Sequence, residues 1–166
     1  MRSSAVKLAD ASGSPSFLAL RQPDLECSLS AELDFHGLCD GVCGGMAVYL
    51  TEKFFCRLYV VQEDGKRYLA ADRLADDMYM PFFRTEVSAE ALTFKLTTDG
   101  RSYYFYYTEN AEETYVGSVS ARFLSTQLAG KCFTGVLTGF FAEGTVNAVG
   151  EICVRRLDIA FPNPHF

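Results

Sequence analysis

The chain has 166 residues, of which 49% are hydrophobic and 14% aromatic, and its net charge is −6. This length and composition predict one globular domain, spanning 1–166, and exclude an intrinsically disordered chain. An acidic chain without a basic patch also argues against nucleic-acid binding, because phosphate recognition needs clustered Lys and Arg.

No continuous apolar run approaches the length that a membrane-spanning helix needs, so we expect no membrane segment. The first ten residues contain no apolar signal-peptide core. Six cysteines are present, several of them inside apolar runs. Buried free thiols and the missing export signal favour reduced cysteines and a cytoplasmic setting.

Short strands are predicted from the beginning of the chain. Residues 1–14 form an entry segment in which Ala5–Ala9 is an expected edge strand, and Phe17–Arg21 is a short strand. Leu25–Phe35 alternates strictly between apolar and polar residues, with Leu25 on the apolar side. Such alternation is typical of a half-buried antiparallel strand.

A hairpin is expected next, between Gly44–Leu50 and Phe54–Gln62. A three-residue loop would place Leu50 opposite Phe54, with Val48 opposite Cys56 and Met46 opposite Leu58. Asp64-Gly65 predicts another hairpin turn.

The strand after this turn is expected over Lys66–Ala71. Asp72–Pro81 has no clear period and predicts a loop or one helical turn, followed by a strand over Phe82–Val87.

The strongest hairpin signal is Asp99-Gly100, which lies between two alternating runs in Leu92–Tyr107. A two-residue loop would set Leu96 opposite Tyr103 and Phe94 opposite Phe105. The apolar face of this hairpin should enter a core. Its other face carries Lys95, Tyr104 and Tyr106, and a polar face with two rings suits a sugar or a partner domain.

The remaining chain predicts a polar turn, three strands and one short helix, in the following order: Glu109–Glu113 (turn), Thr114–Ser120 (strand), Ser125–Leu128 (helix), Phe133–Glu143 (strand) and Gly150–Phe161 (strand). Residues 162–166 are an expected tail. Many short strands with almost no helix indicate an all-β antiparallel sandwich or barrel.

Candidate catalytic groups are few. Glycoside hydrolysis needs two placed carboxylates, but the acidic residues here lie in turns or on polar strand faces, where solvation is the usual role. The candidates are Glu32, Asp34, Asp76, Asp77, Glu112 and Glu113. We therefore predict no catalytic residue in this chain. Cys39 and Cys43, with His36 nearby, lack the second ligand pair of a zinc site.

The order of several segments resembles the C-terminal β-sandwich module of family 43 glycoside hydrolases, the β-xylosidase and α-L-arabinofuranosidase type. The resemblance covers nearly the whole chain and includes Pro15–Gln22, Gly44–Tyr49, the hairpin Leu92–Tyr107, Phe133–Gly139 and Leu157–Phe161. It departs from the family in lacking any Trp, which leaves the sugar undefined.

The resemblance implies a concanavalin A-like jelly roll that packs on a five-bladed propeller, which carries the catalytic carboxylates. No part of this chain resembles that propeller, so it would be supplied in cis or in trans. An aromatic residue of the sandwich walls the active site in such enzymes, and Phe133 occupies the matching position. Related sandwiches can hold calcium through an Asp of the last strand, here Asp158, since oxygen ligands suit this ion.

The resulting prediction is a non-catalytic module of a glycosidase that acts on xylo- or arabino-oligosaccharides. The alternative is a free-standing carbohydrate-binding module with a tyrosine-lined concave face. A third hypothesis, an independent hydrolase with its own carboxylate pair, requires activity from this chain alone.

Overall fold

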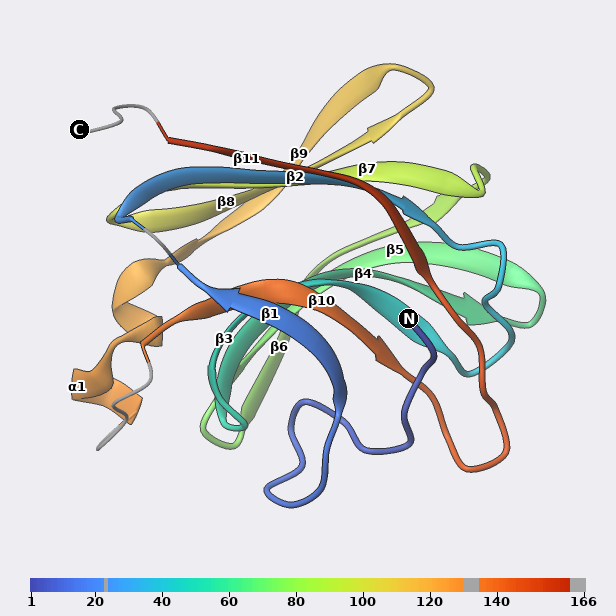
Figure 1. The fold of residues 1–166 in the computed structure, drawn as a ribbon, viewed down its shortest axis with the longest axis horizontal. Helices are drawn as coiled ribbons and strands as arrows, with labels where there is room; N and C mark the ends of the chain where they lie inside the picture. The colour runs from blue at the N-terminus through green and yellow to red at the C-terminus, as the bar shows by residue number, and fades with distance from the viewer. Residues whose placement is uncertain (23, 130–134, 162–166) are drawn as a thin grey trace.

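The computed structural model describes residues 1–22, 24–129 and 135–161. Two antiparallel β-sheets face each other and form a concanavalin A-like sandwich, as the sequence predicts (Figure 1). The six-stranded sheet contains, in spatial order, β1 (Ser16–Arg21), β10 (Leu137–Glu143), β3 (Cys43–Thr51), β4 (Phe54–Glu63), β5 (Lys66–Ala75) and β6 (Met78–Val87). The five-stranded sheet contains β11 (Cys153–Ala160), β2 (Glu26–Asp34), β7 (Ala91–Asp99), β8 (Ser102–Glu109) and β9 (Glu112–Ser120).

The main core lies between the two sheets. Leu33, Phe94 and Phe105 fill it from the five-stranded sheet, and Met46 and Leu58 fill it from the other. In the five-stranded sheet these residues alternate with polar or half-exposed neighbours, because successive side chains of a strand point to opposite faces. On β3 the neighbours of Met46 are buried as well. Leu25, expected on the apolar side, precedes β2 and is exposed instead.

A second apolar cluster covers the outer face of the six-stranded sheet. It includes Phe55, Tyr59 and Phe141, and Leu8 of the N-terminal segment is fully buried in it. The expected edge strand Ala5–Ala9 is wrong. Residues 5–9 form bends and a turn, in which the Lys7 N–H donates to Asp10 at 2.7 Å, and this turn carries Leu8 onto the sheet.

The central hairpin has the predicted inner face but another register. Leu96 pairs with Phe105 and Phe94 with Tyr107, two residues away from the predicted partners. The register differs because Asp99 precedes the tight turn, and Gly100, with φ of 77°, is the first residue within it. A shift by two keeps every side chain on its face, so Leu96 and Phe94 are buried as expected.

The hairpin of β3 and β4 has the predicted pairs Val48 with Cys56 and Met46 with Leu58. A bulge after Tyr49 pairs Phe54 with Thr51, so the expected pair of Leu50 with Phe54 is wrong.

The prediction of a loop or helical turn over Asp72–Pro81 is also wrong. Strand β5 continues to Ala75, Asp76-Asp77 makes the turn, and β6 begins at Met78. Asp76 has a positive φ of 57°, which Asp tolerates better than most residues in a tight hairpin turn. The expected strand Phe82–Val87 is the second half of β6.

The end of the chain has the predicted order of elements with shifted bounds, and β9 begins two residues earlier than expected. A 3-10 helix, η1 (Ala121–Leu124), precedes the short helix α1 (Thr126–Ala129), and strands β10 and β11 start later than expected. Phe133 and the tail 162–166 lie outside the described residues. No helix in the described ranges is long and apolar enough to cross a membrane.

Candidate functional site

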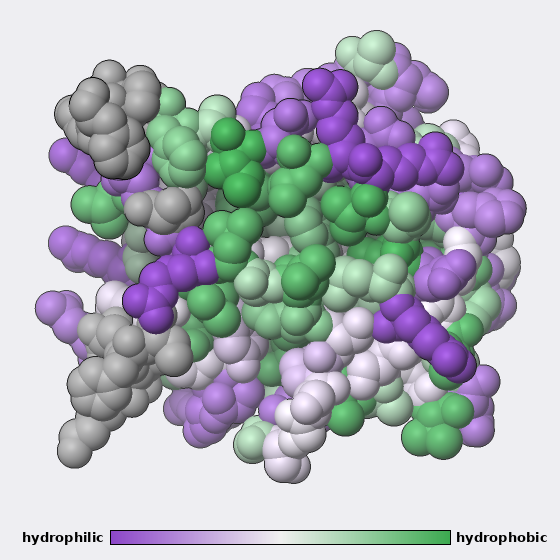
Figure 2. Space-filling model, viewed as in Figure 1, coloured by the Kyte–Doolittle hydropathy of each residue, from purple (hydrophilic) through white to green (hydrophobic). Residues whose placement is uncertain are grey.

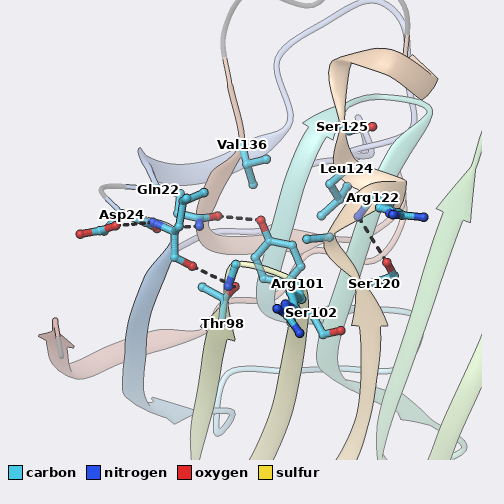
Figure 3. Close-up of a pocket in the computed structure, with 14 residues that line it drawn as sticks. Gln22, Asp24, Thr98, Arg101, Ser102, Ser120, Arg122, Leu124, Ser125 and Val136 are labelled. Carbon is cyan, nitrogen blue, oxygen red and sulfur yellow. Dashed lines mark hydrogen bonds between the residues drawn. The ribbon is translucent and has the colours of Figure 1, made fainter.

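A cavity of about 1160 Å³ opens at one end of the sandwich (Figure 3). Three segments form it: the connection from β1 to β2, the turn between β7 and β8, and η1 with the residues just after it. Val136, which leads into β10, completes the lining. Segments from both sheets therefore meet at this end.

Hydrogen bonds hold the two sheets together across the cavity. Tyr103 Oη donates to Gln22 Oε1 at 2.7 Å, and the Gln22 N–H donates to the Val136 carbonyl at 2.9 Å. Gln22 Nε2 also donates to the Asp24 carbonyl at 2.7 Å. Burial raises the pKa of Tyr103, so its hydroxyl stays a neutral donor and the link to Gln22 persists at neutral pH.

The turn that borders the cavity is fixed by Asp99. Its Oδ1 accepts from the N–H groups of Arg101 and Ser102 at 2.9 and 2.8 Å, and its Oδ2 accepts from Tyr104 Oη at 3.0 Å. These bonds favour the carboxylate and lower the pKa of Asp99. The hydrogen bond to Asp99 in turn raises the pKa of Tyr104.

The cavity lining is rich in hydrogen-bond donors. Arg101 and Arg122 are exposed, and neither guanidinium makes an ion pair with any described residue. Ser102 and Ser125 add hydroxyls. Such a lining can hold and orient a hydroxyl-rich ligand, but its described residues include no nucleophile with an adjacent base.

Lys95, Tyr104 and Tyr106 lie together on the outer face of the five-stranded sheet, as predicted. The Lys95 ammonium lies 5.1 Å from the centre of the Tyr106 ring and 3.0 Å from Glu113 Oε2. Tyr115, which was not predicted from the sequence, adds a third aromatic ring to this face, 5.4 Å from that of Tyr106. This face is separate from the cavity.

Asp158 of β11 is exposed, and its Oδ2 accepts from Arg156 Nε at 3.0 Å. No group of three or more His, Cys, Asp or Glu residues that could hold a metal occurs among the described residues. Calcium at Asp158 stays a prediction.

A buried charged cluster on the outer face of the six-stranded sheet was missed from the sequence. Arg57 donates to Asp72 Oδ1 and Oδ2 at 2.9 and 2.6 Å and to Glu143 Oε2 at 2.9 Å. Tyr79 Oη donates to Asp72 at 2.9 Å. Burial alone would lower the pKa of Arg57, but the hydrogen bonds and charge of Asp72, with the charge of Glu143, outweigh burial and raise it.

The fold defines the chain as a concanavalin A-like β-sandwich domain with a cavity of mixed polar and apolar lining at one end. More specifically, the chain belongs to the family described as the β-xylosidase C-terminal concanavalin A-like domain, whose model matches residues 3–155.

Solved structures of glycoside hydrolase family 43 enzymes have the same fold. GH43B of the Bacteroides ovatus xyloglucan locus aligns over 96% of this chain and 32% of its own, with TM-score 0.87 and 21% identity. The structure of xylan β-1,4-xylosidase from Bacillus halodurans C-125 also aligns over 96% of this chain and 32% of its own, with TM-score 0.82 and 18% identity. The present chain thus spans about a third of these enzymes. No curated protein matches it.

Proposed function

We propose that this chain is a non-catalytic module of a family 43-like glycosidase that acts on xylo- or arabino-oligosaccharides. It packs on a propeller catalytic domain and walls the active site of that domain. The observation that carries the proposal is the family match over residues 3–155, together with alignment to a third of enzymes such as a xylan β-1,4-xylosidase.

The cavity end of the sandwich is the part that we assign to the active-site wall. Phe133 precedes Val136 of the cavity lining by three positions in the sequence. A ring at that position would exclude water and limit the number of sugar units that fit. The hydrogen bonds of Gln22 with Tyr103 and Val136 would keep this end rigid against the propeller.

The surroundings of the buried carboxylates support a non-catalytic role. Asp72 and Glu143 are both bound to Arg57, and the N-terminal segment covers them through the Leu8 N–H, which donates to Glu143 at 2.8 Å. Arg57 therefore occupies the space between the two carboxylates, which a glycosidase pair would need for a sugar and water.

Complementation tests the proposal. The chain alone should not hydrolyse nitrophenyl β-xyloside or α-L-arabinofuranoside, whereas mixing it with the propeller of the same enzyme should give activity. Phe133→Ala should lower kcat/KM of that mixture roughly tenfold, which is about 1.4 kcal/mol of transition-state stabilisation. Tyr115→Ala, an exposed aromatic truncation on another face, should change little. Hydrolysis by the chain alone would contradict the proposal.

A carbohydrate-binding module is the alternative function. The Tyr106 and Tyr115 rings favour it, because Tyr115 is exposed and the two rings lie 5.4 Å apart beside Lys95. Ring faces of this kind complement the apolar face of a pyranose. This function predicts retention on xylan or arabinan in affinity electrophoresis, lost in Tyr104→Ala and Tyr106→Ala. Equal mobility with and without polysaccharide would exclude it.

A further inference from the structure

The two lateral edges of the sandwich differ. At the edge formed by β6 and β9, aromatic side chains close the gap between the sheets. The Phe82 ring lies 6.3 Å from that of Phe105, and the Phe83 ring lies 6.3 Å from that of Tyr107. The core is sealed from water on this side.

The edge formed by β1 and β11 is open. Leu18 pairs with the buried Phe140, and Leu157 and Ile159 pair with the buried Ala31 and Leu29. Paired residues of adjacent antiparallel strands point to the same face, so these three side chains point toward the interior. They are nevertheless 65%, 45% and 38% exposed, respectively.

We call Leu18, Leu157 and Ile159 the open edge. In the view of Figure 1, β1 and β11 run across the front, and Figure 2 shows hydrophobic residues gathered in the middle of this face. Both strands are also terminal in their sheets and present unpaired backbone groups there. Contiguous apolar surface of this kind marks an interface.

We propose that the open edge is the surface that docks the catalytic domain of the glycosidase. This proposal rests on the function proposed above. The family model describes a C-terminal domain, and enzymes such as xylan β-1,4-xylosidase have about two thirds of their length outside the aligned region. The Ile152 N–H donates to the Met1 carbonyl at 2.9 Å, directly before β11, so the N-terminal segment lies beside the open edge.

The chemistry of the open edge suits a protein better than a sugar. Its three side chains are aliphatic and carry no hydrogen-bond groups, whereas a saccharide needs polar partners and ring faces. An aliphatic strip flanked by charged residues matches the apolar centre and polar rim of a domain interface. Arg156 and Asp158 supply such a rim on the outer side of β11.

The test measures binding between this chain and the family 43 propeller domain that is encoded in the same reading frame or the adjacent gene. The double variant Leu18→Glu/Leu157→Glu places charge in the open edge at exposed positions, and circular dichroism checks its fold. Met78→Glu is the matched control, because Met78 is 58% exposed on β6 at the opposite edge. In calorimetric titration, the double variant should bind roughly tenfold more weakly or worse, and Met78→Glu should bind like the wild type.

The outcomes separate this proposal from the function on which it rests. If all three proteins bind the propeller equally, docking at the open edge is overturned and the proposed function stands. If the wild-type chain does not bind the propeller and gives no activity with it, the proposed function itself fails. A homodimer of the chain that the double variant disrupts would assign the open edge to a second copy and overturn the proposal.

Discussion

The backbone N–H of Leu8 donates a 2.8 Å hydrogen bond to Oε1 of Glu143, which lies 135 residues later in the chain. The second carboxylate oxygen of Glu143 binds Arg57. One buried side chain therefore connects the N-terminal segment to the charged cluster on the six-stranded sheet. This connection is independent of both sheet ladders.

Glu143→Ala should destabilise the fold by about 3 kcal/mol, because it leaves the Leu8 N–H and part of Arg57 buried without a partner. Urea unfolding followed by circular dichroism measures the loss. Glu86→Ala, which breaks the exposed pair with Lys66, should change little. Equal losses in the two variants would show that Glu143 is no more important than a surface residue.

Asp99 should stabilise the cavity turn in a pH-dependent way. Its pKa in the folded chain is lower than the ordinary value of 3.8, so folding favours the ionised form. The stabilisation is complete above that ordinary value and is lost as the pH falls through the lower folded pKa. NMR titration should give the shifted pKa. The stability difference between wild type and Asp99→Asn should also shrink on acidification, and a difference that is constant with pH would contradict the assignment.

Gly117 should be needed at the sealed edge. Its φ is 154°, and an added Cβ would lie 3.1 Å from two atoms of the Phe82 ring. Gly117→Ala should therefore cost about 1–3 kcal/mol, through overpacking and backbone strain. Thermal unfolding measures this cost, with Ser118→Ala, an exposed neighbour, as control. Unchanged stability would mean that the Phe82 ring moves aside freely.

The cysteines should differ in reactivity. Cys56 is buried and Cys43 is half-buried, and burial raises the pKa of Cys43 to about 12 and also raises that of Cys56. Because only the thiolate reacts readily, both should resist iodoacetamide until the chain unfolds, whereas the exposed Cys153 should react in the folded state. Mass spectrometry of peptides locates the label. Rapid labelling of Cys56 in the folded chain would contradict this packing.

Local pattern predicted the sandwich and most strand faces, because period-two alternation is a local property of the sequence. It did not fix the central register, where the Asp99 side chain moves the tight turn one residue along. The predicted strand lengths were also limited by local signals: apolar periodicity stops at Ala71, although β5 continues to Ala75.

The charged cluster could have been found by extending one register. The Asp64-Gly65 turn pairs Glu63 with Lys66, and counting along the same ladder places Arg57 opposite Asp72. Ending the strand at Ala71 concealed this pair. Glu143 could not be assigned in this way, because its contact with Arg57 crosses β3 between distant parts of the chain.

Strand order also has a consequence for how the polypeptide reaches its native state. Strand β10 lies between β1 and β3, and β11 completes the other sheet beside β2. Neither sheet can therefore be completed until its last strand, β10 or β11, has been synthesised. Such long-range pairing slows folding and exposes intermediates to aggregation, so nascent chains that stop before β10 should depend on chaperones.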